Sequence, residues 1–201
     1  MSIEESIMKR IESLPQGDLL LPADFSDLGS SEAVRLSLFR LEKQGVISRV
    51  AQGIYVRPKE SSLIGKLMPT AEEVAEAIAR RDRIRTVPTG SYALNALGLS
   101  TQVPMKIVLL TDGSPRIIRV GKRTINFKKT TPKNLLAKGK ISRLVIQALK
   151  ELGNGRQTEA EEKKIVELLR KETENDLRHD IALAPVWIQK IMKKALNDGK
   201  A

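Results

Sequence analysis

Cysteine and histidine, two residue types that often carry covalent or metal chemistry, are scarce in this chain. It contains no cysteine and a single histidine, His179, which lies in the polar run Leu-Arg-His-Asp. A Ser-His-Asp triad or a histidine-ligated metal would have to use that ring, and a lone histidine in such a run is typical of a surface position. The run 121–124, Gly-Lys-Arg-Thr, is similar to the end of a phosphate-binding loop, but the upstream glycine spacing is absent. We therefore expect no catalytic residue, no metal site and no cofactor, in a protein that is not an enzyme.

Basic side chains are the chemically informative residues instead. The 201-residue chain carries 35 Lys and Arg against 24 Asp and Glu, a net charge of +11. Such an excess favours a polyanionic partner, either nucleic acid or an acidic membrane surface. The excess is uneven, because residues 1–60 hold 8 basic and 9 acidic residues, 61–140 hold 15 and 5, and 141–201 hold 12 and 10. The central part of the chain therefore supplies most of the attraction for an anion.

The elements that would position these side chains begin in residues 17–57. A first short helix is predicted over 22–28 and closed by Gly29, and a second helix is predicted over 31–44 and ended by Gly45. Two alternating strands, 46–50 and 54–57, flank the turn Gln52-Gly53. With a preceding helix over 2–14, this order predicts a winged helix-turn-helix over residues 1–60, which lays its second helix in the major groove of DNA.

The helix over 31–44 has one apolar face and one mixed face. At about 100° per residue, Val34, Leu38 and Leu41 share an arc that should face a small core. The opposite half carries charged residues together with Leu36 and Phe39. Two interpretations remain open: a recognition helix that contacts base edges and phosphates, or a surface helix whose Leu36 and Phe39 pack against another domain or chain. The candidate DNA-contacting residues of this helix are Ser31, Arg35, Ser37, Arg40 and Lys43.

The ribbon after this helix contributes residues that would position DNA without reading its sequence. Arg49 and Arg57 lie at the two strand ends and Gln52 lies at the tip, where a wing contacts the phosphate backbone. An equally open interpretation is that both arginines are solvated charges on an edge strand, where they discourage aggregation.

Residues 61–201 predict a second, basic α+β domain. Pro, Ser and Gly in 58–69 predict a linker, and Thr70 with Glu73 predicts a capping box that starts a helix toward Arg85. An apolar strand over 105–111 and a hairpin over 116–129 predict a small sheet within 61–131, and 132–201 predicts helices. The expected fold class of the whole chain is therefore α+β. The candidate DNA-contacting residues of this domain are Arg80, Arg81, Arg83 and Arg85 at the helix end, and Arg119, Lys122, Arg123 and Lys128 in the hairpin.

Two segments of the chain resemble a known family. Residues 38–55, Leu-Phe-Arg-Leu-Glu-Lys-Gln-Gly-Val-Ile-Ser-Arg-Val-Ala-Gln-Gly-Ile-Tyr, follow the helix-turn-helix and resemble the N-terminal domain of AbiEi antitoxins. These are the transcriptional regulators of AbiE-like type IV toxin–antitoxin systems. Residues 97–129, Leu-Gly-Leu-Ser-Thr-Gln-Val-Pro followed by an apolar strand and a basic hairpin, resemble the C-terminal domain of that family. The resemblance covers residues 5–150.

The resemblance implies a repressor that binds inverted repeats in double-stranded operator DNA, autoregulates its operon and acts as an antitoxin in phage defence. It also implies a functional partner, a nucleotidyltransferase-like toxin, with which no stable complex is required. The residues leave a second hypothesis open, in which the winged helix docks a protein through Leu36 and Phe39 and the second domain binds RNA or an acidic surface. No apolar run approaches the roughly 20 residues that span a bilayer, and the acidic N-terminus is not a secretory signal. We therefore expect no membrane partner and a cytoplasmic location.

Overall fold

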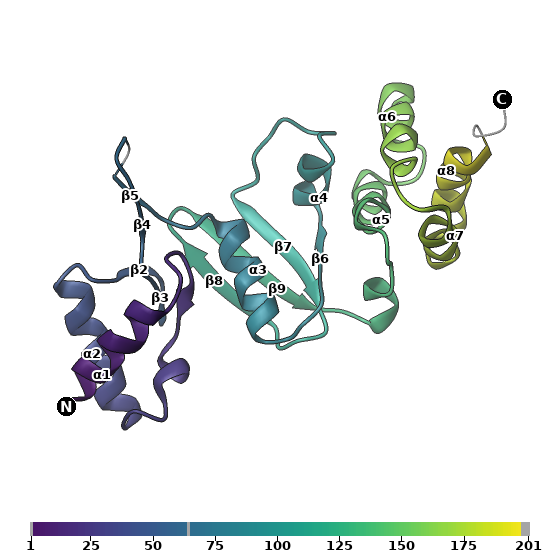
Figure 1. Cartoon of the computed structure of the whole chain (residues 1–201). Coiled ribbons are helices and arrows are strands. Elements are labelled where there is room, and N and C mark those ends of the chain that lie inside the picture. Colours follow the sequence, from purple (N-terminus) through teal and green to yellow (C-terminus); the bar gives the residue numbers. More distant parts are fainter. Residues whose placement is uncertain (1, 64, 198–201) are drawn as a thin grey trace. The chain divides into compact units, whose positions relative to one another are not determined.

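The computed structural model describes residues 2–63 and 65–197 and has an α+β fold, with its elements labelled in Figure 1. The chain forms two compact units. Unit 1 comprises Met1–Arg81 and Ile118–Thr124, and unit 2 comprises Asp82–Ile117 and Ile125–Ala201. The units therefore divide elsewhere than at the expected boundary between residues 60 and 61, because a third helix and the tip of a later hairpin belong to unit 1.

Unit 1 begins with α1 (Ile3–Ser13), β1 (Leu19–Leu20), the 3-10 helix η1 (Pro22–Phe25) and α2 (Ser31–Lys43). The next two strands, β2 (Ser48–Ala51) and β3 (Ile54–Val56), form a ribbon, and β1 pairs with β3 in an antiparallel sheet of order β1-β3-β2. The Oγ of Ser30 caps α2 by accepting a hydrogen bond from the backbone N–H of Ala33, 3.3 Å away. The order of helix, short helix, helix and ribbon agrees with the sequence-based expectation.

The core-facing side of α2 is the one that periodicity predicts. Val34, Leu38 and Leu41 are buried and share a cluster with α1 and η1 residues, among them Ile7 and Phe25. Burying each such side chain contributes about 1.5–3 kcal/mol, so this cluster fixes which residues of α2 face outward. The helix ends where a positive φ is needed, and Gly45, at φ 77°, adopts it without the strain of a Cβ.

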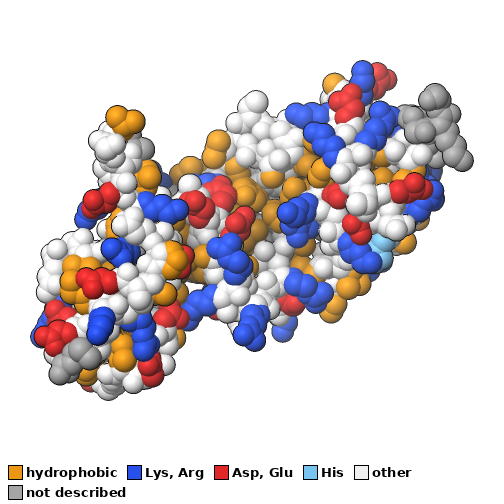
Figure 2. Space-filling view, in the orientation of Figure 1, with side chains coloured by type: hydrophobic (Ala, Val, Ile, Leu, Met, Phe, Trp, Pro, Cys, Tyr) orange, Lys and Arg blue, Asp and Glu red, His pale blue; other side chains and the backbone are white. Residues whose placement is uncertain are grey.

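Residues 58–69 are not the linker that their composition suggests. They form a two-stranded antiparallel hairpin, β4 (Lys59–Ser61) and β5 (Gly65–Leu67), and Gly65, at φ 73°, permits its turn. Leu63, near the turn, is 92 % exposed, and Figure 2 shows apolar side chains at this end of the hairpin. A lone two-stranded hairpin is marginally stable in water. The Nζ of Lys66 donates to the carbonyl oxygen of Gly45 (3.1 Å) and ties the hairpin to the end of α2.

The third helix of unit 1, α3 (Ala71–Arg81), begins with the capping box that the sequence predicts. The backbone N–H of Glu73 donates to Thr70 Oγ1 at 3.2 Å, and that of Thr70 donates to Glu73 Oε2 at 2.7 Å. The hydrogen bond from the Thr70 backbone N–H stabilises the ionised carboxylate, and it is the main cause that lowers the pKa of Glu73.

A four-stranded sheet follows, with the order β6-β7-β9-β8. Its elements are β6 (Thr86–Thr89), β7 (Lys106–Thr111), β8 (Arg116–Val120) and β9 (Arg123–Lys129), with the short helix α4 (Ser91–Ala96) after β6. The hairpin of β8 and β9 has one buried and one exposed face, since Ile125 and Phe127 are buried while Arg119 and Lys128 are exposed. Strand β6, which contains Pro88, was not among the predicted strands. It lies at a sheet edge, where proline is tolerated.

The C-terminal part of unit 2 is helical, as expected. It comprises the 3-10 helix η2 (Pro132–Leu135), α5 (Lys140–Leu152), α6 (Glu159–Leu169), α7 (Glu174–Leu183) and α8 (Val186–Asn197). Val145, Leu149 and Ile165 are buried in its core, and Trp187 is partly buried at the edge of this core. Among the described residues, no helix combines the length and the apolar character needed to cross a membrane.

The N-terminus of α5 is capped by carboxylates that are distant in sequence. The backbone N–H groups of Lys138 and Gly139 donate to the two oxygens of the fully buried Asp180, at 2.9 and 2.8 Å. The backbone N–H of Ile141 donates to Glu172. A Cβ at residue 139 would lie 2.7 Å from Ser142 Oγ and 2.8 Å from the Glu172 carboxylate, so a larger residue there would displace these side chains. Asp180 and Glu172 thereby hold α5 against α7 and the loop before it.

Candidate nucleic-acid interface

The outward face of α2 carries basic side chains that are available for a ligand. Arg35 is exposed and makes no hydrogen bond or ion pair with any residue that the structure describes. Lys43 is exposed, with its Nζ 5.5 Å from the ring centroid of Phe39. Ser31 is exposed in the first turn. These three residues therefore lie on the exposed side of α2.

Two other candidates on α2 are placed differently. Ser37 is only 5 % exposed, so the expectation that its hydroxyl contacts DNA is wrong for this conformation. The reason is its spacing, because residue 37 lies three residues after Val34 and four before Leu41, on the buried arc. Arg40 is exposed, but its Nη1 lies 3.4 Å from Glu4 Oε2 of α1. Such a surface ion pair contributes about 0–1 kcal/mol, so Arg40 can exchange it for a phosphate at little cost.

The ribbon places its candidates at the two ends and the tip. Gln52 is exposed in the turn. The Nε of Arg49 donates to the carbonyl oxygen of Ala51 at 3.4 Å, and the Arg49 side chain remains exposed. Arg57 points elsewhere, since its Nη1 donates to the carbonyl oxygen of Glu12 at the end of α1 (3.1 Å). Arg57 therefore acts as a structural contact in unit 1.

The arginines around the end of α3 divide into two pairs. Arg80 and Arg83 are exposed. Arg81 forms an ion pair with Asp24 of η1 at 3.2 Å. Arg85 donates from its backbone N and its Nε to the two oxygens of Asp112, both at 2.8 Å, and these bonds lower the pKa of Asp112. The helix ends at Arg81, four residues before the end of the arginine-rich run.

The hairpin of β8 and β9 presents three of its four candidates. Arg119, Lys122 and Lys128 are exposed. Arg123 instead donates from its Nη1 to both carboxylate oxygens of Glu72 on α3, at 2.6 and 2.7 Å. Composition counts alone treat these four cations as equivalent, whereas one of them joins two segments of unit 1.

A basic run that sequence analysis did not single out extends beyond the hairpin. Residues 113–150 contain eleven Lys and Arg and no Asp or Glu. The run covers β8, β9, η2 and most of α5. Lys and Arg side chains are spread over the visible face of the protein (Figure 2), and are not gathered on one element. A shorter counting window would have found this run from the sequence.

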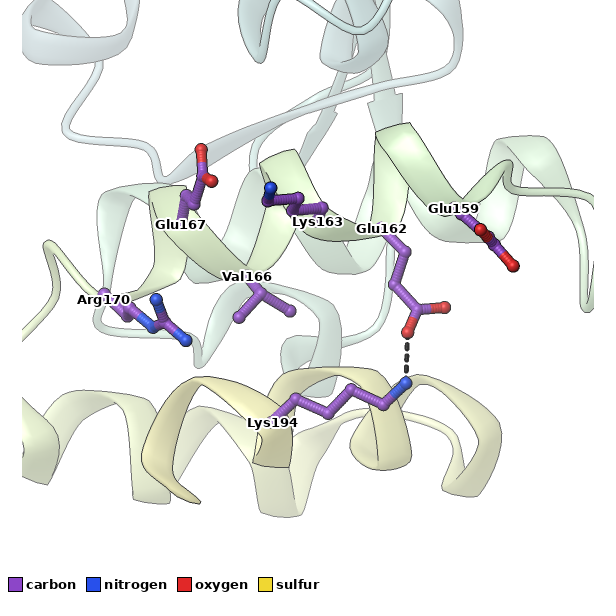
Figure 3. A pocket seen from close by; sticks show the side chains of 7 residues that line it. All are labelled: Glu159, Glu162, Lys163, Val166, Glu167, Arg170 and Lys194. Atoms are coloured by element: carbon purple, nitrogen blue, oxygen red, sulfur yellow. Dashed lines mark hydrogen bonds and ion pairs between the residues drawn. The ribbon is translucent and has the colours of Figure 1, made fainter. Parts of the chain in front are cut away.

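Two clusters of titratable groups lie among the C-terminal helices. A charged pocket between α6 and α8 contains both signs of charge (Figure 3), and Lys194 pairs with Glu162 across it, which lowers the pKa of Glu162. His179 Nδ1 lies 2.8 Å from Asp180 Oδ1, but both oxygens of Asp180 already accept backbone N–H groups. Within residues 2–63 and 65–197, no group of three His, Cys, Asp or Glu is arranged to hold a metal ion.

An apolar patch interrupts the basic face of α2. Leu36 is 50 % and Phe39 is 49 % exposed. Leu36 also lines a groove between α1 and α2, together with Ile3 and Met8. Glu4 and Glu5 lie on the α1 side of this groove, which makes its rim acidic there. The groove therefore combines apolar and charged side chains.

The chain belongs to a protein family of unknown function, DUF6088, whose family model matches residues 6–177. A comparison with curated proteins finds no match.

Proposed function

We propose that the protein is a sequence-specific DNA-binding repressor whose unit 1 acts as a winged helix-turn-helix. The observation that carries this proposal is the outward face of α2, where Arg35 and Lys43 are exposed and Arg35 has no partner among the described residues. The sheet order β1-β3-β2 places a ribbon directly after this helix. A helix with unpaired basic residues, followed by a ribbon, is the arrangement with which winged helices read the major groove and contact the backbone.

The net charge of +11 supports a polyanionic ligand. In the proposed complex, the exposed residues Arg119, Lys122 and Lys128 contact phosphates without reading sequence, while Arg80 and Arg83 add attraction. Arg81, Arg85 and Arg123 keep their carboxylate partners and have structural roles.

The biological role that we propose is that of an antitoxin and autoregulator in an AbiE-like type IV toxin–antitoxin system. It rests on the resemblance of residues 38–55 and 97–129 to AbiEi antitoxins. In this role the protein is a cytoplasmic non-enzyme without a cofactor, its ligand is an operator with inverted repeats, and its functional partner is a nucleotidyltransferase-like toxin. A gene for such a toxin beside its own gene would support the assignment.

A protein- or RNA-binding module is the second candidate function. It is favoured by the exposure of Leu36 and Phe39 beside the α1–α2 groove, because a DNA-reading face usually carries polar side chains there. In this case α2 docks a partner protein and the basic residues of 113–150 bind RNA or an acidic surface.

A gel-shift titration of the full chain separates these functions. The probes are the duplex upstream of its own gene, a scrambled duplex of the same composition, and an RNA of the same length, each at two salt concentrations. A preference of about a hundredfold or more for the upstream duplex is expected for a specific regulator. Equal, steeply salt-dependent binding to both duplexes, or tighter binding to RNA, would reject the repressor and favour the second candidate.

Replacing Arg35 with alanine should reduce sequence preference and leave the protein folded. One lost contact to a base edge costs about 1–3 kcal/mol, so the upstream duplex should bind about 5- to 150-fold more weakly while the scrambled duplex changes little. Arg178→Ala, which removes an exposed arginine from α7, is the matched control and should change neither. An equal loss on both duplexes would show that Arg35 contacts only the backbone.

A further inference from the structure

A hollow between η2, α5 and α7 gathers three cations. Lys133, Arg143 and Lys150 line it together with the amide side chains of Asn134 and Gln147. None of the lining residues in the described part of the chain is acidic. It lies at the end of the acid-free run 113–150, and Glu151 follows that run directly. Three like charges around one depression repel each other unless an anion joins them.

One donor among these cations has no partner in the part of the chain that the structure describes, while Lys133 and Lys150 are exposed. The Nε of Arg143 is buried and has no hydrogen-bond partner among the described residues. The Nζ of Lys150 donates to Asn134 Oδ1 at 3.2 Å, which uses one of its three protons. Partial burial lowers the pKa of Lys150, and the charge of Lys133 lowers it further. A buried orphan donor in a native structure calls for a ligand or an ordered water.

The polar groups of the hollow are held in place before any ligand arrives. Asn134 donates from its Nδ2 to Thr130 Oγ1 at 2.8 Å, which orients its Oδ1 toward Lys150. Gln147 is 4 % exposed, and its Oε1 accepts a hydrogen bond from Thr89 Oγ1 at 3.4 Å. Arg143 and Lys150 lie on the same helix, two turns apart, and Lys133 lies on η2. The donors therefore come from two helical elements.

We propose that this hollow binds a single phosphate group, which sits at its mouth and accepts hydrogen bonds from Lys133, Arg143 and Lys150. The oxygens of a phosphate accept hydrogen bonds from these donors, and its negative charge balances their positive charges. Arginine and lysine are the side chains that bind phosphate most often. The phosphate can belong to a nucleic-acid backbone or to a small phosphate compound. Only in the first case does the inference rest on the proposed DNA-binding function.

Titration of the full chain with inorganic phosphate at low, constant ionic strength tests the site. Saturable changes in the NMR signals of Asn134 and Gln147 are expected, and the pKa of Lys150 should rise because the bound anion stabilises its charged form. Lys150→Met should weaken phosphate binding at least tenfold, and Lys133→Met should do the same. Lys163→Met, at an exposed lysine of α6, is the matched control and should bind as the unmodified protein does.

Duplex binding by the same variants identifies the source of the phosphate. If it is a backbone phosphate, Lys150→Met should reduce the slope of log affinity against log salt by about one and weaken upstream and scrambled duplexes alike. Saturable phosphate binding with an unchanged duplex slope would support a small phosphate compound as the ligand.

The proposal is overturned if phosphate causes no saturable change and both Lys150→Met and Lys133→Met leave the duplex slope unaltered. If the unmodified protein still prefers its upstream duplex in that case, the repressor function stands without this site. If the unmodified protein binds phosphate saturably but binds neither duplex, the repressor function is rejected and the phosphate site stands.

Discussion

Reversing three exposed charges of the β8–β9 hairpin should weaken DNA binding about a hundredfold, on specific and scrambled duplexes alike. The variant combines Arg119→Glu, Lys122→Glu and Lys128→Glu. All three side chains are exposed, so the change leaves the buried face of the hairpin, with Ile125 and Phe127, intact. Each phosphate contact that is lost removes about 0.9 from the slope of log affinity against log salt, so the slope should fall by about three.

The control variant has the same change in net charge, but its substitutions lie elsewhere in the chain. Lys163→Glu, Lys171→Glu and Lys190→Glu replace three exposed lysines on and around the C-terminal helices. If the hairpin contacts DNA directly, this control should lose much less affinity than the hairpin variant. Equal losses would show that the attraction is a diffuse effect of net charge, and the hairpin would no longer count as a contact surface.

Replacing Asp180 with alanine should lower the free energy of unfolding by about 3 kcal/mol. Asp180 is fully buried, and its oxygens accept the backbone N–H groups of Lys138 and Gly139 as well as facing His179 Nδ1. Without the carboxylate, two backbone donors before α5 lose their partner in a position that water reaches poorly. Asp180→Asn, which keeps one oxygen acceptor, should fall between the alanine variant and the unmodified protein.

The measurement is urea unfolding followed by tryptophan fluorescence. Trp187 is the only tryptophan in the chain and packs against the same helical core, so it reports on this part of unit 2. Glu174→Ala on α7 is the control, because Glu174 forms an exposed pair with Arg178 and should change the free energy of unfolding by less than about 0.5 kcal/mol. A loss of the same small size for Asp180→Ala would show that water replaces the carboxylate as the cap.

Local signals in the sequence predicted most of the elements. The helical stripe of Val34, Leu38 and Leu41 predicted the buried face of α2, and Thr70 with Glu73 predicted the start of α3. These features depend on residues three to seven positions apart, so a single sequence contains them. The same periodicity also places Ser37 on the buried arc, because it lies three residues after Val34 and four before Leu41.

Contacts between distant segments could not be predicted in this way. The sequence gives no indication that Arg123 pairs with Glu72, or that Arg81 pairs with Asp24, because each pair depends on how the elements pack. Four arginines in a run of six therefore looked equivalent, although two of them are committed to carboxylates. The hairpin over 59–67 was not predicted for another reason. Its glycine and serine residues are as typical of a linker as of a tight turn.

Unit 1 is assembled from two stretches of sequence, and this affects the order in which the protein can fold during synthesis. Residues 118–124 are made after all of residues 1–81, and Arg123 lies 51 positions after Glu72, with which it pairs. At about 5–20 residues per second, a ribosome needs about 2–9 s to extend the chain from the end of α3 to the end of that segment. Throughout this interval the nascent unit 1 lacks residues 118–124. Unit 1 therefore completes its fold only after more than half of the chain has been translated.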